Sequence, residues 1–226
     1  MPPWALAGGR RALLARFDDA AVLPRLKADI AEKLRQRGGK AAILFAAGNP
    51  RYVGKTLQEV AEATGQSPVD TAIAALRESE MLVANFNQSE ADVRTFMALP
   101  WVMTSSDSSA GHPRSYGSFA RKYDEYVIRQ KTITLGQFVR SSTSLTADTL
   151  GLAMRGRLKA GYFADVVVFD PAKFKAMATY TEPAVLSTGV VLTLVNGHPT
   201  VENGVPTGQA AGRVLRRQLA PGLCLH

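Results

Sequence analysis

The sequence predicts an α/β fold, and three observations carry that prediction. Up to about residue 150, short apolar runs typical of buried strands alternate with amphipathic stretches that carry helix-capping signals. Beyond that point the chain becomes rich in β-branched residues and in Asn-Gly turn pairs. The composition, with 46% hydrophobic and 20% charged residues, is that of a chain that buries a core, which excludes a disordered tail or a fibrous repeat.

Three short runs in the first part of the chain are predicted to be strands. Each is largely apolar, and the first, which is continuously apolar, suits a strand that is buried on both faces, as in a parallel sheet. The runs are residues 41–47 (AAILFAA), 81–86 (MLVANF) and 101–106 (WVMTSS). The third run leads directly into Asp107, so the prediction puts that carboxylate at the end of a buried strand.

Helices are predicted before, between and after these runs from apolar periodicity and from capping residues. In residues 18–37 the apolar side chains recur at helical spacing, and a glycine pair at residues 38–39 ends the run. Four later starts carry a polar residue that can accept a hydrogen bond from the first helical turn. They are Thr56 with Glu59, Ser67 with Pro68, Ser89 with Asp92, and Thr134 with Gln137.

The last third of the chain is predicted to be a small β-rich unit. Its strand candidates are residues 163–170 (FADVVVFD), 189–195 (GVVLTLV) and 212–217 (GRVLRR). Asn196-Gly197 and Asn203-Gly204 are turn pairs of the hairpin type. We therefore predict two domains, comprising residues 1–152 and residues 153–226.

The charge balance and the scarcity of metal ligands exclude several classes of protein. The 27 Lys and Arg residues against 19 Asp and Glu give a net charge of +8. The basic residues are scattered, without the aromatic interleaving or the recognition helix of a nucleic-acid-binding protein. A single cysteine, Cys224, excludes an intramolecular disulfide framework and is interpreted as an incidental thiol. Histidine is also scarce, since the chain has only His112, His198 and His226.

The sequence gives no signal for export or membrane insertion. The apolar stretch at residues 4–7 is too short for the core of a signal peptide, and Arg10 and Arg11 follow it closely. No window approaches the ~18 consecutive apolar residues that a membrane-spanning helix needs. We therefore expect a protein of the reducing cytoplasm that binds neither membrane nor nucleic acid.

Asp107 is the strongest candidate for chemistry. It follows a predicted strand, within Ser-Ser-Asp-Ser-Ser and ahead of Gly111-His112-Pro113-Arg114, at the place where α/β folds keep their active sites. Short polar residues in such a position also often do no more than cap a loop. From position alone, both interpretations stay open.

Five segments, in the same order along the chain, resemble one family of hydrolases. They are residues 50–70 (PRYVGKTLQEVAEATGQSPVD), 86–103 (FNQSEADVRTFMALPWVM), 102–121 (VMTSSDSSAGHPRSYGSFAR), 155–171 (RGRLKAGYFADVVVFDP) and 194–217 (LVNGHPTVENGVPTGQAAGRVLRR). Together they are similar to the C-terminal half of the D-aminoacylase group, the N-acyl-D-amino-acid deacylases of the amidohydrolase superfamily. The resemblance extends over most of the chain, roughly from Pro3 to Arg217.

The resemblance implies a partial (β/α) TIM-type barrel, comprising its last strands and helices, followed by a small β-sandwich-like domain. It also implies zinc at the ends of the barrel strands and an N-acyl-D-amino acid as substrate. Asp107 matches the family's aspartate after the last barrel strand, which takes a proton from metal-bound water and passes it to the leaving amine. The same residue is a weak candidate for a metal ligand. Amide hydrolysis needs both an activated water and a group that protonates the nitrogen before the C–N bond breaks.

His112 and Arg114 match the family's His-Pro-Arg stretch, which makes both residues candidates for substrate binding. The planar guanidinium of Arg114 could pair with a substrate carboxylate through two parallel hydrogen bonds. The alternative, that both side chains only hold the loop, stays open.

This chain departs from the family in its metal ligands. The family carries an H-x-H or related motif near its beginning, whereas the first histidine here follows Asp107. Zinc takes three or four protein ligands, and Asp107 with one loop histidine would not hold it. Three predicted strands also fall short of the eight in a complete barrel.

We therefore expect the chain to be the last part of a longer enzyme, without zinc and without activity on its own. Open strand edges lead us to expect that it pairs with a second polypeptide or self-associates. The alternative is a non-catalytic subunit or a pseudoenzyme fragment that serves assembly or ligand binding.

Overall fold

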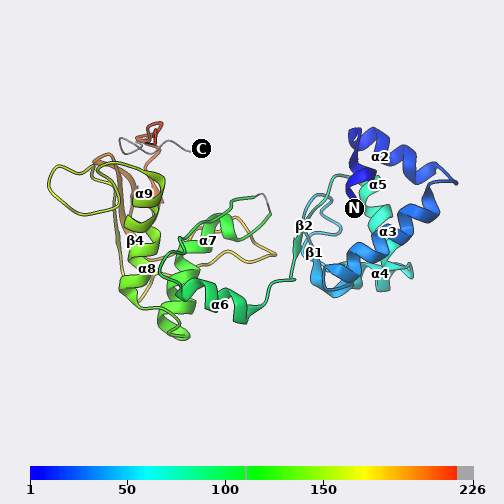
Figure 1. The fold of residues 1–226 in the computed structure, drawn as a ribbon, viewed down its shortest axis with the longest axis horizontal. Helices are drawn as coiled ribbons and strands as arrows, with labels where there is room; N and C mark the ends of the chain where they lie inside the picture. The colour runs from blue at the N-terminus through cyan, green and yellow to red at the C-terminus, as the bar shows by residue number, and fades with distance from the viewer. Residues whose placement is uncertain (110, 218–226) are drawn as a thin grey trace, which may run out of the picture. The chain divides into compact units, whose positions relative to one another are not determined.

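The computed structural model describes residues 1–109 and 111–217, so Cys224 and His226 lie outside the described residues. The chain divides into two compact units (Figure 1). Unit 1 comprises Met1–Gln88 and Ala110–His112, and unit 2 comprises Ser89–Ser109 and Pro113–His226. The division into domains of residues 1–152 and 153–226 stays a prediction.

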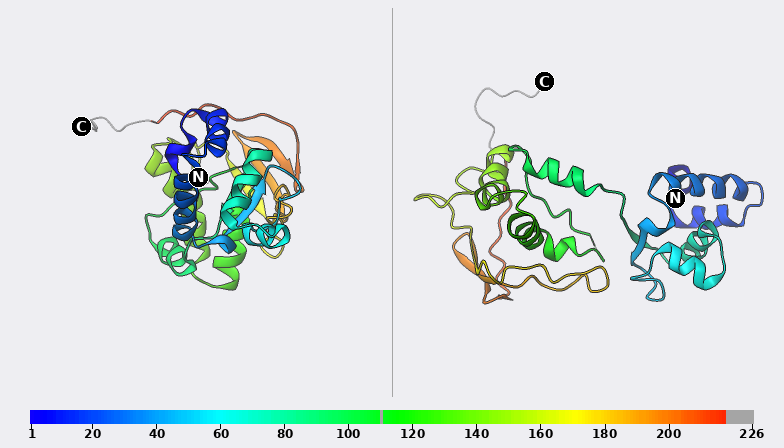
Figure 2. Two further views of the ribbon diagram at one scale, coloured as in Figure 1. Left: turned by 90° about the vertical axis from the view of Figure 1, so that its right-hand side faces the viewer. Right: turned by 90° about the horizontal axis from the view of Figure 1, so that it is seen from below.

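Unit 1 consists mainly of helices that gather beside a pair of strands (Figure 2). Its elements are α1 (Pro3–Leu6), α2 (Gly9–Asp18), α3 (Leu23–Gln36), the 3₁₀ turn η1 (Lys40–Ala42), β1 (Ile43–Ala47), α4 (Leu57–Thr64), α5 (Pro68–Glu78) and β2 (Leu82–Asn85). The helix predicted over residues 18–37 is confirmed as α3, whereas α1 and α2 were not predicted. Amphipathic packing explains the helices, because one apolar cluster is formed by Ala5, Leu13, Phe17, Leu26, Ile30 and Ile73.

The predicted helix starts in unit 1 are confirmed. The Thr56 hydroxyl accepts a hydrogen bond from the Glu59 backbone N–H at 3.1 Å, and the Glu59 carboxylate accepts one from the Thr56 N–H at 2.7 Å. This reciprocal capping box opens α4, and Gly65 ends it in the left-handed conformation. At α5 the Ser67 hydroxyl accepts a hydrogen bond from the Asp70 N–H at 3.1 Å, and Pro68 is the first residue of the helix.

Both strands of unit 1 form where they were predicted, but their pairing direction differs from the predicted one. β1 and β2 run antiparallel, with Ile43 opposite Asn85, rather than parallel. The prediction was wrong because an apolar run indicates burial and does not encode strand direction. Nor is β2 buried on both faces, since Leu82 is 51% and Val83 43% exposed.

Unit 2 begins with helices and a short π-helix. They are α6 (Glu90–Ala98), α7 (Arg114–Arg121), the π-helix η2 (Lys122–Arg129), α8 (Leu135–Ser142) and α9 (Ser144–Leu150). The predicted caps are confirmed, because the hydroxyls of Ser89 and Thr134 accept hydrogen bonds from the backbone N–H groups three residues on. In η2 the buried side chains are Lys122, Tyr123 and Tyr126, and the two tyrosines join the core of this unit.

Residues 101–106 do not form the predicted third strand. Within the described part of the chain, neither of the two sheets includes this segment. A strand requires a neighbour to complete its hydrogen-bond ladder. Here the Thr104 N–H instead donates to the Ser141 carbonyl at the end of α8, at 2.9 Å.

The last part of unit 2 forms one four-stranded antiparallel sheet in the order β3-β4-β5-β6. The strands are β3 (Val166–Phe169), β4 (Val190–Val195), β5 (His198–Glu202) and β6 (Val205–Pro206). The two predicted strands at 163–170 and 189–195 and both Asn-Gly hairpin turns are confirmed, with Asn196 and Asn203 at positive φ. Residues 212–217 form no strand, so that prediction was wrong. In this tail Val214 is 90% exposed, so it contributes almost no buried apolar surface to the sheet.

The core of unit 2 joins its helices to its sheet. Aromatic rings dominate it, because Tyr123 lies within 5.6 Å, centroid to centroid, of Phe138, Phe169 and Phe174. Such tilted and edge-on ring pairs add stability beyond the area that they bury. No helix among the described residues is long and apolar enough to cross a bilayer.

A buried arginine ties the segment before β3 to the β4–β5 turn. Arg155 is 9% exposed and forms an ion pair with Asp165. It also donates to the Asn196 side-chain oxygen at 2.5 Å, and its guanidinium stacks 4.2 Å from the centre of the Phe163 ring. The Asp165 carboxylate accepts a further bond from the Asn196 N–H at 2.8 Å. These contacts satisfy a cation that would be costly to bury alone.

Candidate functional site

Asp107 lies in the loop that follows residues 101–106, and its backbone has a positive φ of 44°. Aspartate is one of the residues that tolerates this left-handed conformation, because its short side chain can bond locally. The side chain is 82% exposed, so the carboxylate is accessible to solvent or to a further molecule. No other described residue of the segment 101–109 has a positive φ, so the chain turns sharply at the candidate residue itself.

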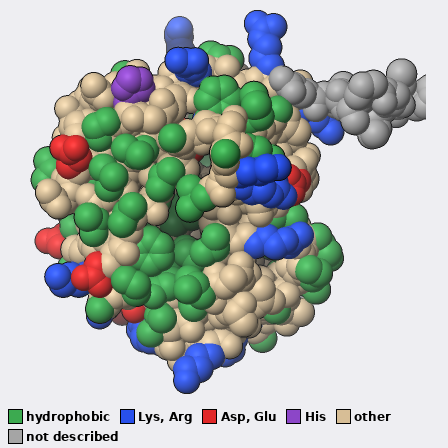
Figure 3. All heavy atoms as spheres, turned by 90° about the vertical axis from the view of Figure 1, so that its left-hand side faces the viewer, with side chains coloured by type: hydrophobic (Ala, Val, Ile, Leu, Met, Phe, Trp, Pro, Cys, Tyr) green, Lys and Arg blue, Asp and Glu red, His purple; other side chains and the backbone are tan. Residues whose placement is uncertain are grey.

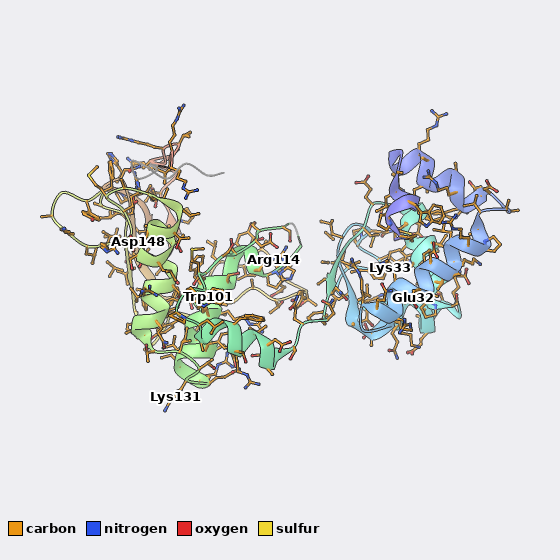
Figure 4. All side chains as sticks on the ribbon, in the orientation of Figure 1. Glu32, Lys33, Trp101, Arg114, Lys131 and Asp148 are labelled. Carbon is orange, nitrogen blue, oxygen red and sulfur yellow. The ribbon has the colours of Figure 1, made fainter. Side chains whose placement is uncertain are left out.

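The structure brings Asp107 and Arg114 together. Arg114 is the first residue of α7 (Figure 4), and its Nη2 lies 3.0 Å from the Asp107 Oδ2. The same nitrogen donates to the Ser109 hydroxyl at 3.1 Å. The guanidinium of Arg114, which also bonds Ser109, therefore holds the Asp107 carboxylate through a charge-assisted hydrogen bond.

Serine hydroxyls fasten this loop to the first turn of α7. The Ser109 N–H donates to the Ser115 hydroxyl at 3.1 Å, and that hydroxyl donates in turn to the Ser109 carbonyl at 2.9 Å. The Ser108 hydroxyl donates to the same oxygen of Ser115 at 2.9 Å. The polar run around Asp107 thus has a local structural function, in line with the loop-holding interpretation, while the carboxylate stays exposed.

His112 is half-buried and belongs to the short segment that is part of unit 1. In the same segment, Gly111 has a positive φ of 69°, and a Cβ there would lie 2.2 Å from the Ala46 carbonyl oxygen of β1. This close approach requires glycine. The structure therefore groups Arg114 with Asp107, whereas the segment of His112 packs with β1. The roles of Asp107, His112 and Arg114 in binding and catalysis stay predictions.

The described residues do not fit a zinc site on their own. Among residues 1–109 and 111–217, histidine, cysteine, aspartate and glutamate side chains do not come together in any group of three that could hold a metal. Asp107 faces a guanidinium, and one carboxylate is too few ligands for zinc. The arrangement places the exposed carboxylate of Asp107, a group that can act as a general acid or base, beside the guanidinium of Arg114, a group that can bind an anion.

Sequence reasoning missed the polar cluster behind this loop. Lys122, at the start of η2, is only 7% exposed, and its Nζ donates to the hydroxyls of Thr104 at 2.7 Å and Ser141 at 2.9 Å. Burial lowers the pKa of the Lys122 ammonium from its ordinary value. The available signal was a lysine directly before Tyr123 and four residues before Tyr126, in a stretch whose aromatic residues mark a buried helix face.

Comparison with known proteins gives the family. The profile of the amidohydrolase family matches residues 4–201, which is most of the chain. The chain belongs to the amidohydrolase family.

Within that family the chain is similar to the D-aminoacylase group, which confirms the resemblance found in its sequence motifs. It is 37% identical over 186 residues to a D-aminoacylase from Alcaligenes xylosoxydans xylosoxydans, and the match covers 80% of this chain and 38% of the relative. It is 35% identical over 179 residues to an N-acyl-D-glutamate deacylase from the same organism, covering 77% of this chain and 36% of the relative. The chain thus spans well under half the length of the curated relatives that it matches.

Solved structures agree with this assignment. A crystal structure of D-aminoacylase matches with a TM-score of 0.70 at 34% identity, covering 77% of this chain and 38% of that chain. A crystal structure of an N-acyl-D-glutamate deacylase from Bordetella bronchiseptica, complexed with zinc and a phosphonate that mimics the tetrahedral intermediate, matches with a TM-score of 0.67 at 29% identity, covering 91% of this chain and 45% of that chain. A further structure that matches comes from a study of the binuclear metal centre in D-aminoacylase. D-aminoacylase with its binuclear metal centre and the deacylase with zinc show that relatives of this chain hold metal, and the α/β fold of this chain is similar to theirs.

Proposed function

We propose that this chain supplies the general acid/base and part of the substrate pocket for hydrolysis of the amide bond of N-acyl-D-amino acids. The observation that carries the proposal is the exposed carboxylate of Asp107 held 3.0 Å from Arg114, inside a segment that matches the amidohydrolase family. The relatives at 35% and 37% identity are named for this reaction or its D-glutamate version.

In the proposed reaction Asp107 carries one proton. Its carboxylate takes a proton from the attacking water as the new C–O bond forms at the amide carbon. The resulting carboxylic acid then gives that proton to the nitrogen, which leaves as the amine when the C–N bond breaks. Because the Asp107 side chain is 82% exposed, it can reach water without rearrangement of the core.

Arg114 and His112 are the proposed substrate-binding residues. An N-acyl amino acid carries a carboxylate, and a guanidinium fork matches that group with two parallel hydrogen bonds. In this chain one guanidinium nitrogen, Nη2, lies 3.0 Å from the Asp107 carboxylate, so the side chain stands beside the proposed general acid/base.

The protein ligands for the metal of the proposed reaction would lie outside the described residues, which do not fit a metal site on their own. Zinc is the proposed metal, since the deacylase from Bordetella bronchiseptica was solved with zinc. Within the whole enzyme we propose that this chain forms the last strands and helices of a TIM-type barrel, and that its four-stranded sheet is one layer of a small β-sandwich.

We further propose that the chain pairs with the polypeptide that supplies the rest of the barrel, or self-associates. Exposed apolar side chains support this proposal, since Val167 is 57% and Val191 43% exposed on neighbouring strands. Figure 3, which views the side on which β4 lies in Figure 1, shows hydrophobic side chains gathered in the middle of that face. Size-exclusion chromatography tests the association, and a stable monomer at every concentration would contradict it.

Metal analysis combined with an N-acyl-D-amino-acid hydrolysis assay tests the catalytic proposal. The assay compares the chain alone with the chain in its longer or two-chain form. We expect zinc near stoichiometry and turnover only in the second, with turnover abolished by Asp107→Asn and retained by Asp148→Asn, an exposed aspartate of α9. If neither form binds metal or turns over substrate, the alternative of a non-catalytic subunit or pseudoenzyme fragment takes its place.

A further inference from the structure

The segment that carries Asp107 is held by side chains rather than by a sheet. Residues 101–106 form no strand, and yet Thr104 makes a dense set of hydrogen bonds. Its N–H donates to the Ser141 carbonyl at 2.9 Å, and its hydroxyl lies 2.9 Å from the Ser142 hydroxyl. The same hydroxyl accepts a bond from the Lys122 ammonium at 2.7 Å. Thr104 is therefore the point at which this segment is fixed to α8 and η2.

Lys122 is the centre of that cluster. Its side chain is buried, and both oxygen atoms that accept its hydrogen bonds belong to hydroxyls rather than to a carboxylate. Burying an ammonium among neutral partners costs free energy, so this position is an expensive one for a lysine. A methionine or leucine would avoid this cost. The free-energy cost of burying this ammonium indicates that its charge has a specific role in the structure.

The helix that carries Lys122 also carries Arg114. α7 begins at Arg114 and runs directly into η2 at Lys122, about 12 Å further along a helix that rises 1.5 Å per residue. Thr104 precedes Asp107 by three residues. The bond from Lys122 to Thr104 therefore links the two pieces of chain whose ends form the Asp107–Arg114 pair.

We propose that Lys122 is a positioning residue for Asp107: by fixing Thr104 against η2 and α8, its ammonium holds the Asp107 loop in register with Arg114. The catalytic meaning of this role rests on the proposed function of Asp107, whereas the positioning itself does not. Lys122 acts through Thr104 and touches no reacting group.

Hydrogen exchange of the full chain, measured residue by residue, tests the positioning. Thr104→Val removes the hydroxyl that accepts the Lys122 bond and keeps the shape of the side chain, and Thr104→Ser keeps the hydroxyl. We expect Thr104→Val to speed exchange at the amides of Thr104 and Ser109 by about tenfold or more, because each amide needs the loop in place to keep its hydrogen bond. The Phe138 amide, bonded to the Thr134 carbonyl in α8, should stay within about twofold, as should every amide in Thr104→Ser.

Lys122→Met is the second variant for the hydrogen-exchange test. Its control is Lys131→Met, which removes an exposed lysine instead (Figure 4). We expect Lys122→Met to reproduce the Thr104→Val pattern and Lys131→Met to leave it unchanged. If Lys122→Met does not fold, the two Thr104 variants decide the matter. An unchanged rate at Ser109, or an equal rise across all helices of unit 2, would overturn the proposal, because Lys122 would then have only a general structural role.

The activity of the longer or two-chain form separates this proposal from the proposed function. We expect Thr104→Val to lower kcat and Thr104→Ser to restore it. If the exchange pattern is found but Asp107→Asn still turns over substrate, the catalytic role of Asp107 is wrong and the positioning by Lys122 stands.

Discussion

The two units of this chain bury different kinds of side chain. Among the described residues, the buried polar side chain of unit 1 is Thr71, whose hydroxyl bonds the Ser67 carbonyl one turn back in its own helix. Unit 2 buries two cations, Lys122 and Arg155, whose hydrogen-bond partners lie between 10 and 41 residues away in sequence. A buried hydroxyl can be satisfied locally, whereas a buried cation needs partners from several elements. Unit 1 also has polar contacts between distant residues, such as the Tyr52 hydroxyl that donates to Glu78 at 2.7 Å, but among the described residues it is unit 2 that buries cations on such contacts.

The largest effect is expected in the apolar core of unit 1. Leu26 in α3 is fully buried, so Leu26→Ala should lower the free energy of unfolding by about 3 kcal/mol through lost burial and the cavity left behind. Leu6→Ala removes the same atoms from a side chain that is 51% exposed, and should cost less than about 1 kcal/mol. Urea unfolding followed by circular dichroism measures both. Equal losses would show that unit 1 does not depend on this core.

A second effect tests the buried cation of unit 2. Asp165→Asn removes the charge that pairs with Arg155 and should lower the free energy of unfolding by roughly 2 kcal/mol, because the guanidinium stays buried. The matched control is Asp148→Asn, which breaks the exposed pair with Arg157 and should have a much smaller effect. Thermal and urea unfolding of both variants give the comparison. Similar effects would mean that burial of the cation is irrelevant to unit 2.

A third, smaller effect should be the same in both units. Thr56→Ala and Thr134→Ala each remove a capping box, one at α4 and one at α8, and each should cost about 1 kcal/mol. Serine at either position keeps the accepting hydroxyl and should lose only a fraction of that amount. Chemical denaturation of the four variants is the measurement. Clearly unequal losses from the two alanine variants would mean that local capping also differs between the units.

The smallest effect is a pH dependence in unit 1. The Lys27 ammonium, 2.7 Å from Asp70, and the Ser67 hydroxyl together hold the pKa of the Asp70 carboxyl below its ordinary value. Its contribution to stability is therefore complete above the ordinary pKa and is lost as the pH falls through the lowered one. Stability differences between the parent chain and Asp70→Asn, measured between about pH 6 and pH 2, should shrink toward acid. A difference that is constant with pH would contradict this.

Sequence-based prediction succeeded for features that neighbouring residues determine and failed for features that depend on residues far apart in sequence. Local signals were sufficient for α3, α4, α5, α6 and α8, because a cap and an apolar period are properties of neighbouring residues. They also predicted β3, β4 and both hairpin turns. They failed for the pairing direction of β1 and for residues 101–106, since both depend on which segments lie alongside.

The candidate site shows the same limit. Asp107 could be singled out from its place after a predicted strand and Arg114 from its match to the family's His-Pro-Arg stretch, and the structure brings the two together. The bond between Lys122 and Thr104 could not be predicted, because it joins residues 18 apart across two elements and obeys no periodic pattern. Nor does the sequence distance of two residues between His112 and Arg114 indicate that they belong to different compact units.

The π-helix η2 makes the geometry of this region sensitive to chain length. Its hydrogen bonds span five residues, as between the Gln130 N–H and the Glu125 carbonyl, and the Arg129–Asp124 and Gln130–Glu125 side-chain pairs keep that spacing. Deleting one residue between 122 and 129 would return the backbone to ordinary α-helical winding. The side chains of this stretch would then leave the positions that the five-residue spacing gives them, because successive residues of an α-helix are about 100° apart around its axis. Tyr123 and Tyr126 lie within this stretch and belong to the core of unit 2, so the loss of one residue here would disturb that core together with the helix that begins at Arg114.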